Sequence, residues 1–422
     1  MLQLNHIREN KQEVIDRLAV KNMDAAPAID KILQKDEERR KTQNELDQTL
    51  SEANALARDI GDLMKAGKKE DAEAMKAKTG SLKATSKSLS EKLDMLEKEQ
   101  NDLLVALPNT PHVSVPAGKS AEDNVTVYTW GQMPSMADTA KPHWELAAQH
   151  DLIDFDAGNK LTGAGFPVYK GKGARLQRAL INFFLDKATE AGYQEIQPPI
   201  LINEASGFGT GQLPDKEGQM YHVTEDGFYL IPTAEVPVTN LYRDVILQEK
   251  DFPVKMTAYT PCFRREAGSY GKDVRGLNRL HQFDKVEIVQ LQHPDKSYQT
   301  LEEMKEYVSG LLQQLGLHFR ILKLCGGDMS FASALTYDFE VYSAAQQRWL
   351  EVSSVSNFET FQANRMKLRF KDADKKTRLA HTLNGSALAL PRIVAALLEN
   401  NQHGEGISIP QVLVPYTGFD RI

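Results

Sequence analysis

The sequence predicts an α+β protein in which a long antiparallel α-helical coiled-coil hairpin is followed by a domain with a mainly antiparallel sheet flanked by helices. Three observations lead to this prediction. Apolar residues in the first hundred positions recur at alternating spacings of three and four, no aromatic residue lies between positions 25 and 104, and short β-rich runs alternate with helical patterns after a proline-rich segment. The 422 residues also exceed what one ordinary core requires and indicate two or three domains.

The hairpin is predicted from two apolar series joined by a polar turn at residues 65–71. The first series is Leu46, Leu50, Ala53, Ala57, Ile60 and Met64, and the second is Ala72, Met75, Thr79, Leu82, Ser86, Leu89, Leu93, Leu96, Gln100 and Leu103. Each series forms a stripe along one side of a helix, so that two helices can bury their stripes against each other. About 38 residues per arm at ~1.5 Å per residue predict a rod on the order of 57 Å long.

The predicted tip of the hairpin is basic. Between positions 65 and 87 seven lysines stand against three acidic residues, a local charge of +4. These lysines are Lys65, Lys68, Lys69, Lys76, Lys78, Lys83 and Lys87. Such a stretch is either a solvated coiled-coil face, which is the more frequent case for an arbitrary hairpin, or a surface that contacts the phosphate backbone of RNA.

A segment with three prolines, residues 107–116, separates the hairpin from the rest of the chain. We therefore expect a helical arm domain at residues 1–106, a linker at 107–118 and a mixed domain at 119–422. Strands are expected at 229–232, 286–290 and 339–342, and helices at 173–191 and 301–315. Because the strands are unevenly spaced and only one or two helices are long, the sheet should be mainly antiparallel rather than doubly wound.

Composition argues against several classes of protein. The net charge of −7 does not suit a protein that coats nucleic acid indiscriminately, although it is compatible with a local basic patch. No apolar run reaches the ~18 residues of a membrane span, and the first residues lack the apolar region of a secretory signal, so no membrane partner is expected. Two cysteines, Cys262 and Cys325, are too few for a disulfide framework or a paired-cysteine zinc site, and we expect a cytoplasmic protein.

Residues 260–288 are the segment richest in candidate chemistry. Their pattern predicts a strand, a long polar loop and a second strand, and their charged residues include Arg264, Arg265, Lys272, Arg275 and Arg279 together with Glu266, Asp273 and Glu287. Arginines beside a β-hairpin can bind phosphate or carboxylate through two hydrogen bonds, and Phe283 offers an aromatic face to a base. A surface network of ion pairs is an equally good interpretation of this segment alone. The sequence has no P-loop motif, and its glycine-rich residues 207–211 are predicted to form a loop.

Five strings in the sequence resemble those of bacterial-type seryl-tRNA synthetases, which are class II aminoacyl-tRNA synthetases. They are Ile-Pro-Thr-Ala-Glu-Val-Pro (231–237), Thr-Pro-Cys-Phe-Arg-Arg-Glu-Ala-Gly (260–268), His-Gln-Phe-Asp-Lys-Val-Glu (281–287), Glu-Val-Ser-Ser (351–354) and His-Thr-Leu-Asn-Gly-Ser (381–386). With the helical arm, the resemblance covers essentially the whole chain. The three class II signatures would be Pro198 with Pro199, the hairpin of residues 263–287, and the strand–helix segment 385–398 with Arg392.

The resemblance implies a class II synthetase domain at residues 119–422 and the activity of a serine–tRNA ligase. Such an enzyme activates serine with ATP to seryl-adenylate and transfers the seryl group to the 3′ end of tRNA(Ser), with tRNA(Sec) as a second candidate acceptor. The resemblance also implies Mg²⁺ bound with ATP, and a homodimer in which the arm of one subunit serves tRNA on the other active site. In-line phosphoryl transfer depends on positioning and charge neutralisation, so no protein nucleophile is needed.

The resemblance assigns roles in the ATP site residue by residue. Arg264 and Arg392 would be the catalytic arginines, with Arg264 on the α-phosphate and the serine carboxylate and Arg392 on the γ-phosphate. Glu266 would bind the adenine amino group, and Phe283 would stack on the ring. The whole ATP site would consist of Arg264, Arg265, Glu266, Leu280, Phe283, Glu351, Val352, Ser353, Ser354 and Arg392, of which Glu351 and Ser354 would also bind Mg²⁺.

The resemblance also implies a serine site and a tRNA surface. The serine site would consist of Thr233, Ala234, Glu235, Arg264, Glu287, Asn384 and Ser386, and the tRNA contacts of Lys65, Lys68, Lys69, Lys76 and Lys83. Thr233 and Glu235 would receive the serine ammonium group, and Glu287 would help to recognise the hydroxyl. Singly, these would be ordinary turn, strand or surface residues, and only their joint occurrence in the family's strings supports the roles. No zinc is expected, because the ammonium-binding residues are of the zinc-free type.

The sequence departs from the family pattern at a few positions. Pro391 precedes Arg392 where many relatives have glycine. Proline is tolerated in the first turn of a helix, so we expect Arg392 to keep its place. Asn364 stands where arginine is common, and Val355 and Phe358 replace small or sulfur-containing residues near the predicted magnesium strand.

Two other functions stay open at this point. One is a paralogue that activates an amino acid but loads a carrier protein or acts in regulation, and the other is a catalytically silent scaffold that oligomerises through its coiled coil. Exchange of pyrophosphate into ATP, tested with serine against the other amino acids, would separate these functions from a serine–tRNA ligase.

Overall fold

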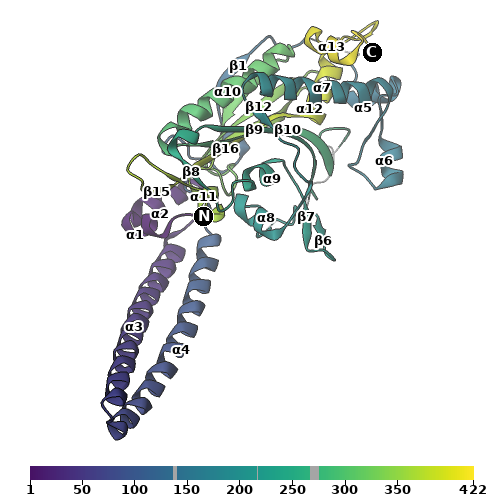
Figure 1. Ribbon diagram of the computed structural model, residues 1–422. Coiled ribbons are helices and arrows are strands. Elements are labelled where there is room, and N and C mark those ends of the chain that lie inside the picture. Colours follow the sequence, from purple (N-terminus) through teal and green to yellow (C-terminus); the bar gives the residue numbers. More distant parts are fainter. Residues whose placement is uncertain (136–139, 216, 267–274) are drawn as a thin grey trace. The chain divides into compact units, whose positions relative to one another are not determined.

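The computed structural model describes residues 1–135, 140–215, 217–266 and 275–422. The chain divides into two compact units (Figure 1). The arm unit consists of Leu2–Ala19 and Met23–Pro108, and the sheet unit consists of Met1, Val20–Asn22 and Asn109–Ile422.

The arm unit is dominated by two long helices, α3 (Ala26–Lys65) and α4 (Lys69–Val105), which run side by side as an antiparallel hairpin (Figure 1). Two shorter helices, α1 (Leu4–Glu9) and α2 (Lys11–Val20), precede them. Gly67 lies between α3 and α4 in the left-handed region, with a φ of 77°, which lets the chain reverse within three residues. The predicted hairpin is confirmed, with a shorter turn than expected.

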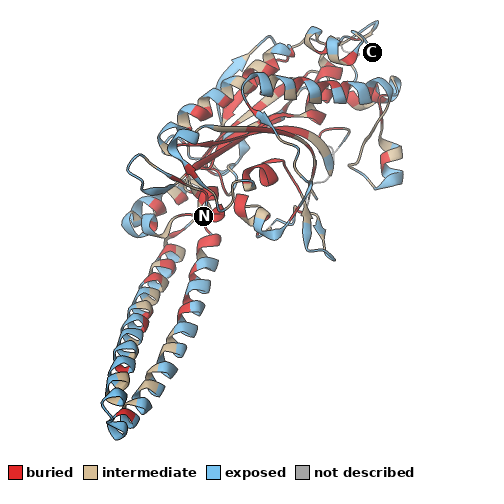
Figure 2. Cartoon of the chain, in the orientation of Figure 1, coloured by how far each residue is buried: buried red, intermediate tan, exposed pale blue. Residues whose placement is uncertain are grey.

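The stripe that α4 buries follows the predicted series, whereas the stripe of α3 differs from it. In α3, Leu46 is buried as predicted, but Leu50 and Met64 are exposed, whereas Leu56 is buried and Thr49 is half-buried. Figure 2 shows buried and half-buried positions recurring along both long helices. From Leu46 to Met64 the buried or half-buried positions are 46, 49, 53, 56, 60, 61 and 63, so the predicted order of steps was wrong there. Steps of three then four keep a stripe on one side of a helix as well as steps of four then three, and the facing helix decides between them.

The sheet unit is built on an eight-stranded sheet. Its strands are β1 (Val125–Trp130), β4 (Gln194–Glu195), β9 (Val254–Phe263), β10 (Gln282–Gln292), β11 (Phe319–Lys323), β12 (Leu335–Ser343), β13 (Arg348–Asn357) and β16 (His381–Ala389). Their order across the sheet is β1-β11-β12-β13-β16-β10-β9-β4. All neighbouring pairs are antiparallel except β4 with β9, which confirms the prediction of a mainly antiparallel sheet.

Helices cover both faces of this sheet (Figure 1). They include α5 (His143–Gln149), α7 (Gly171–Glu190), α9 (Glu235–Asn240), α10 (Ser297–Gln314), α11 (Phe361–Met366) and α12 (Leu390–Asn400). The helices α7, α10 and α12 form the largest core with strand residues such as Val286 and Ile288, and α9 and α11 pack with Val289 and Leu291 on the opposite face. Because side chains alternate along a strand, Glu287 lies on the same face as α9.

Residues 207–210 are helical, so the prediction of a loop there was wrong. They belong to α8 (Glu204–Thr210), whose first turn is capped by the Asn203 side chain and which ends at Gly211, at a φ of 92°. A Cβ on Gly207 would lie 2.8 Å from Leu213, and one on Gly209 would lie 2.6 Å from Asn240. These glycines therefore allow close packing of α8 rather than marking a flexible segment.

The remaining elements of the sheet unit are short. They are α6 (Phe155–Leu161), α13 (Val414–Thr417), β2 (Ile153–Asp154), β3 (Val168–Tyr169), β5 (Leu201–Ile202), β6 (His222–Val223), β7 (Phe228–Leu230), β8 (Ile246–Gln248), β14 (Arg369–Lys371), β15 (Thr377–Leu379), β17 (Gln402–His403) and β18 (Gly406–Ile407). Among the described residues, no helix combines the length and the apolar character that crossing a membrane requires.

Candidate active site

The predicted serine-binding residues come together on the α9 face of the sheet. Glu287 on β10 lies opposite Ser386 on β16 in the strand register, and Asn384 lies two positions before Ser386, on the same face. Thr233 precedes α9 and Glu235 begins it, while α9 packs on β9 and β10. All five side chains are buried, so the fold gathers polar groups where water is largely excluded.

A compact hydrogen-bond network joins these residues and adds one that the sequence analysis missed. Thr233 Oγ1 donates to Glu287 Oε2 at 3.1 Å and accepts from the backbone N–H of Glu235 at 3.2 Å. The missed residue is Lys285, whose buried Nζ lies 2.5 Å from Glu287 Oε2 and 2.9 Å from Thr233 Oγ1. A signal for it was present, because Lys285 stands two positions before Glu287 in a predicted strand.

Glu235 carries the second buried carboxylate of this pocket. Gln362 on α11 donates to Glu235 Oε1 at 2.6 Å and is itself held by Thr382, whose hydroxyl donates to Gln362 Oε1 at 2.6 Å. Burial, reinforced by the charge of Glu287, raises the pKa of Glu235 to about 7. The sequence analysis missed Gln362, since nothing in the local pattern of α11 distinguishes it from a core residue.

Arg264 and Phe283 lie together next to the serine-binding residues. The Arg264 guanidinium sits 5.2 Å from the centre of the Phe283 ring, and its Nε donates to the carbonyl of Pro232 at 3.4 Å. The register pairs Phe283 with Cys262, so the antiparallel pairing of β9 and β10 brings the two predicted ATP residues side by side. When a planar guanidinium lies over an aromatic ring, the outer N–H groups of the guanidinium can still donate hydrogen bonds to an anion.

Glu266, predicted for the adenine, follows β9 and forms an ion pair with Arg279 at 3.2 Å. Its φ of 48° places it in the left-handed region. Arg265 is exposed and makes a backbone hydrogen bond to Gln219 at 2.9 Å. The predicted loop residues Lys272 and Asp273 lie outside the described residues. The ion pair between Glu266 and Arg279 therefore joins the chain before position 267 to the chain after position 274.

Arg392 lies in the first turn of α12, directly after Pro391, as predicted. Its Nε donates to the carbonyl of Asn278 at 3.0 Å, and its Nη1 donates to the carbonyl of Glu351 at 2.7 Å. The Glu351 carboxylate lies 3.7 Å from the same Nη1. The structure thus joins the predicted phosphate-binding arginine to the predicted magnesium carboxylate.

The predicted metal residues Glu351 and Ser354 lie on β13 beside a further carboxylate, Asp338 on β12. Asp338 faces Ser354 across the strands and hydrogen-bonds with it, yet its Oδ1 is buried without a partner among the described residues. Burial and the neighbouring charge of Glu351 raise the pKa of Asp338 well above its ordinary value. The sequence analysis missed Asp338, although its position next to Phe339 in a predicted strand is a signal for the polar face.

Three residues predicted for the ATP site have side chains that do not open toward it. Val352 and Leu280 belong to the largest apolar core. The Ser353 hydroxyl donates to the carbonyl of Ser386 at 2.6 Å. The side chains of these three residues therefore pack or hydrogen-bond within the protein.

Comparison with known proteins identifies the family. Residues 1–111 match the model of the seryl-tRNA synthetase N-terminal domain, and residues 221–401 match that of the tRNA synthetase class II core domain (G, H, P, S and T). The chain is 52% identical over 424 aligned positions to a serine–tRNA ligase of Salinibacter ruber, with 100% of this chain and 99% of that protein covered. The chain belongs to the seryl-tRNA synthetase family. Its activity is that of a serine–tRNA ligase.

Other relatives and solved structures agree with this assignment to the seryl-tRNA synthetases. A serine–tRNA ligase of Akkermansia muciniphila is 48% identical, with 100% of this chain and 99% of that protein covered. The crystal structure of seryl-tRNA synthetase from Pyrococcus horikoshii complexed with ATP is 33% identical, with a TM-score of 0.94 and coverage of 100% and 99%. The serine–tRNA ligase of Naegleria fowleri in complex with AMP shares the fold at a TM-score of 0.89 and 24% identity, with coverage of 100% and 98%.

The lysines predicted to contact tRNA lie in the arm unit of this synthetase. Lys65 lies 3.6 Å from Asp62, and Lys76 lies 2.9 Å from Glu73, while both side chains are largely exposed. Lys68, Lys69 and Lys83 are also exposed. Exposed lysines agree with both interpretations of this stretch, a solvated face and a contact with RNA.

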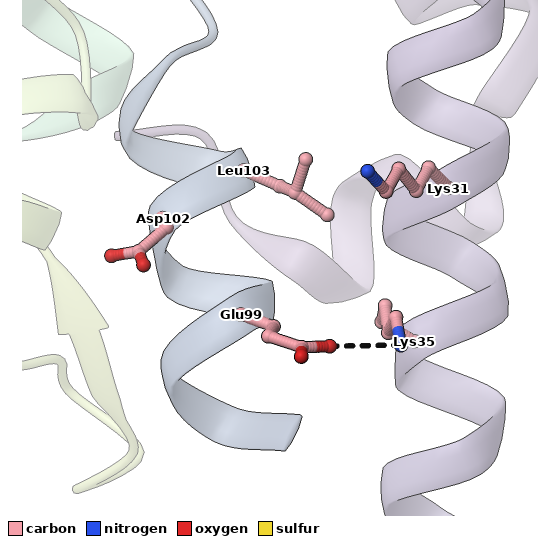
Figure 3. A pocket seen from close by; sticks show the side chains of 5 residues that line it. All are labelled: Lys31, Lys35, Glu99, Asp102 and Leu103. Carbon is pink, nitrogen blue, oxygen red and sulfur yellow. Dashed lines mark ion pairs between the residues drawn. The ribbon is translucent and has the colours of Figure 1, made fainter. Parts of the chain in front are cut away.

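A groove at the base of the synthetase arm lies between α3 and α4 (Figure 3). It has a volume of about 510 Å³ and is lined by Lys31, Lys35, Glu99, Asp102 and Leu103. The Nζ of Lys35 lies 2.8 Å from the Glu99 carboxylate across the two helices. None of the residues predicted for ATP, serine or tRNA lines this groove, and its charges largely neutralise one another.

Proposed function

We propose that this chain activates serine with ATP to seryl-adenylate and transfers the seryl group to tRNA(Ser) in a pocket bounded by α9, β10, β13 and β16. The observation that carries this proposal is the junction of two neighbouring groups of residues. One is the buried network of Thr233, Lys285 and Glu287, and the other is Arg264 over Phe283. The first suits an amino acid with a hydroxyl, and the second suits a nucleotide.

In this proposal the serine ammonium group binds to Thr233 and Glu235, and the hydroxyl is recognised by Glu287, Asn384 and Ser386. The Lys285–Glu287 contact of 2.5 Å supports a division of labour between the two carboxylates. Lys285 compensates the charge of Glu287. Glu235 would therefore be the carboxylate that pairs with the ammonium group of the bound serine. A pocket built to hydrogen-bond a hydroxyl rejects an analogue that lacks it by ~10⁴ or more, because buried partners are left unpaired.

ATP would lie across Arg264, Phe283 and Arg392. The serine carboxylate oxygen attacks the α-phosphorus, an O–P bond forms, and the bond to pyrophosphate breaks. Arg264 would bind the α-phosphate and the serine carboxylate, while Arg392 would neutralise charge at the γ-phosphate. Adenine would stack on Phe283 and donate its amino protons to Glu266. Positioning and charge neutralisation of this kind supply most of the catalysis in phosphoryl transfer.

The remaining predicted ATP residues would contribute in a more limited way. Leu280 and Val352 would contribute backbone or packing, since their side chains lie in the apolar core. Ser353 would hold β16 through its hydrogen bond to Ser386. Arg265, exposed beside Glu266, would approach the phosphates from the solvent side. Most of the side-chain contacts to ATP would thus come from four residues, Arg264, Glu266, Phe283 and Arg392.

Magnesium would be held by Glu351 and Ser354. The donor set consists of oxygens, which a hard cation prefers, and the unpartnered Oδ1 of Asp338 beside Ser354 supports a place for positive charge. When bound, magnesium would neutralise phosphate charge during the reaction. That no zinc is bound stays a prediction.

The acceptors and the assembly are part of the same proposal. The arm domain (residues 1–106) would contact tRNA(Ser) through Lys65, Lys68, Lys69, Lys76 and Lys83, the linker (107–118) would follow it, and the catalytic domain (119–422) would form a homodimer. The arm of each subunit would bind the tRNA that is charged at the active site of the other subunit. The enzyme would act in the cytoplasm. A structure of an M. kandleri SerRS in complex with A. aeolicus tRNASec shares the fold, at 18% identity and a TM-score of 0.58 over 79% of this chain and 68% of that one. We include tRNA(Sec) as a second candidate acceptor.

Pyrophosphate exchange and tRNA charging test the proposed roles. Arg392→Ala should lower serine-dependent exchange of pyrophosphate into ATP by about a hundredfold or more, because the variant no longer stabilises charge in the transition state. Arg421→Ala, which removes a surface ion pair with Glu405, is the matched control and should leave exchange unchanged. Equal exchange in the two variants would refute the role of Arg392, and exchange driven by an amino acid other than serine would refute the proposed substrate.

A further inference from the structure

A buried hydrogen-bond network, made of residues other than the predicted site residues, connects α12 to α5. Its centre is Glu399, which is fully buried near the end of α12. Glu399 Oε1 accepts from the backbone N–H of His143 at 2.9 Å, from His143 Nδ1 at 2.7 Å and from Gln346 Nε2 at 2.9 Å. The Ser343 hydroxyl donates to Oε2. The carboxylate therefore has a donor on each oxygen and three donors on one of them.

These contacts define the state of the His143 ring. A carboxylate can only accept, so Nδ1 of His143 carries the proton that it donates to Glu399. The other ring nitrogen, Nε2, accepts from the backbone N–H of Leu277 at 2.8 Å. A Cβ at Gly276 would lie 2.3 Å from Nε2, and the φ of Gly276 is 64°. Only glycine lets the backbone come this close in this conformation, and both nitrogens of the ring are used.

The segment that His143 holds is the one that orients the proposed ATP residues. The carbonyl of Asn278 accepts from Arg392 Nε at 3.0 Å, and Arg279 forms the 3.2 Å ion pair with Glu266. Asn278 Nδ2 also donates to Gln346 Oε1 at 2.9 Å, and Gln346 Nε2 in turn donates to Glu399. The hydrogen bonds thus connect Asn278 to Glu399 through a second residue.

Helix geometry makes this a two-point attachment. Arg392 and Glu399 are seven residues apart in α12, nearly two turns, so they lie on the same side of the helix. Arg392 contacts residue 278 directly, and Glu399 reaches residue 277 through the imidazole of His143. One side of α12 is thereby tied to one short stretch of backbone at two places.

We propose that His143 is a positioning residue for ATP: its neutral Nε2 holds Leu277, and through the adjacent residues it orients Arg392 and the Arg279–Glu266 pair. The proposal rests on the ATP roles proposed above for Arg392 and Glu266. A misplacement of about 1 Å at a remote position can lower a rate by about a hundredfold, so loss of this acceptor should be visible in ATP kinetics. The serine pocket has its own network and should be little affected.

Two substitutions separate the ring nitrogens. The side-chain amide nitrogen of asparagine lies as many bonds from Cβ as Nδ1 does, so His143→Asn can keep the donor to Glu399 while removing the acceptor for Leu277. The side-chain oxygen of glutamine lies as many bonds from Cβ as Nε2 does, so His143→Gln can keep that acceptor while removing the donor. Both variants lose the ring, and a purely structural role would affect them alike.

The experiment is pyrophosphate exchange by full-length enzyme, with thermal melting to measure the folded fraction. We expect His143→Asn to raise the KM for ATP and lower kcat, giving a decrease in kcat/KM for ATP of about tenfold to a hundredfold. The KM for serine should stay within about twofold, and His143→Gln should recover at least about half of the loss on a logarithmic scale. Ser343→Ala, which removes a different donor to Glu399, should lower the melting temperature without changing the KM for ATP.

The proposal is overturned if folded His143→Asn has the wild-type KM for ATP and kcat, or if the Asn and Gln variants lose activity equally. Arg392→Ala distinguishes this failure from a failure of the proposed ATP site. If Arg392→Ala impairs exchange while His143→Asn does not, only the inference on His143 is wrong. If Arg392→Ala is also without effect, the proposed ATP site itself is wrong.

Discussion

The ammonium group of Lys285 lies 2.5 Å from the carboxylate of Glu287, and both side chains are buried beside Thr233. The pair is internal to the protein, so a carboxylate that would otherwise attract any cation is already compensated. In the proposed serine site, Glu287 would then accept a hydrogen bond from the neutral hydroxyl, and Glu235 would receive the substrate ammonium group. The contact would thereby give two similar buried acids different functions.

Removing the cation should disturb serine binding more than ATP binding. Lys285→Met leaves Glu287 buried without its partner, and losing one member of a buried ion pair typically costs ~3–5 kcal/mol. We expect the KM for serine to rise by about tenfold or more, with the KM for ATP within about twofold, in pyrophosphate exchange. Lys376→Met, which removes an exposed contact to Asp374, is the matched control. Parallel increases in both KM values in Lys285→Met would contradict the assignment.

Removing the carboxylate itself should abolish recognition of the hydroxyl. Glu287→Ala is expected to reduce serine-dependent exchange by about a thousandfold or more, because the buried partners of Glu287 lose their acceptor. ATP binding, measured by quenching of tryptophan fluorescence or by calorimetry, should persist. An equal loss of ATP affinity would indicate that the variant had damaged the pocket as a whole.

Serine affinity should depend on pH near neutrality. The pKa of Glu235 is raised to about 7, so below that pH the side chain is protonated and cannot pair with the serine ammonium group. The KM for serine should therefore rise as pH falls below about 7, approaching tenfold per unit, and level off above it. Glu235→Gln should remove this dependence while raising the KM at pH 8. A wild-type KM for serine that is constant between pH 6 and pH 8 would show that Glu235 does not bind the ammonium group.

The same carboxyl group should affect stability in the absence of substrate. Its pKa rises on folding from 4.5 to about 7, so the folded state binds more protons between those values and the free energy of unfolding falls as pH increases through that window. Glu235→Gln cannot titrate, so relative to wild type it should gain stability between pH 5 and pH 8. Denaturant melts of both proteins at these two pH values measure the difference, and a constant difference would contradict it.

The basic tip of the arm should contribute to tRNA charging but not to serine activation. Replacing Lys65, Lys68, Lys69, Lys76 and Lys83 by glutamine should leave pyrophosphate exchange unchanged and lower kcat/KM for tRNA. The slope of the logarithmic salt dependence should weaken by about one unit for each lysine–phosphate interaction that the substitutions remove. Lys41→Gln with Lys92→Gln, exposed positions nearer the base of the arm, is the control. An unchanged salt dependence in the tip variant would favour a merely solvated face.

Local patterns were sufficient for the elements that depend on local spacing. The two helices of the arm follow from repeated steps of three and four, because a helix returns to the same side about every 3.6 residues. The two strands at the ends of residues 260–288 follow from β-rich runs on either side of a polar stretch, and Arg392 stays in the first turn of α12 although Pro391 precedes it. The resemblance to known strings named the residues that gather around Glu287.

The failures occur where packing against another part of the chain decides the outcome. Gly207 and Gly209 indicate a loop locally, yet both lie inside a helix. Leu213 and Asn240 pack so close to them that a Cβ atom at either position would clash, and glycine is therefore needed. The facing helix α4 selects which residues of α3 are buried, a choice that spacing alone leaves open.

By itself, the amino-acid sequence determined the division into arm and sheet, the type of each long element and the family to which the chain belongs, since these depend on periodicity and on contiguous strings. Only the tertiary structure decided that Lys285 compensates Glu287, that Gln362 holds Glu235, and that His143 links Glu399 to Leu277. Strand register and helix packing create these contacts between residues up to 256 positions apart. Burial then gives them their strength, because an unpaired polar group away from water is costly.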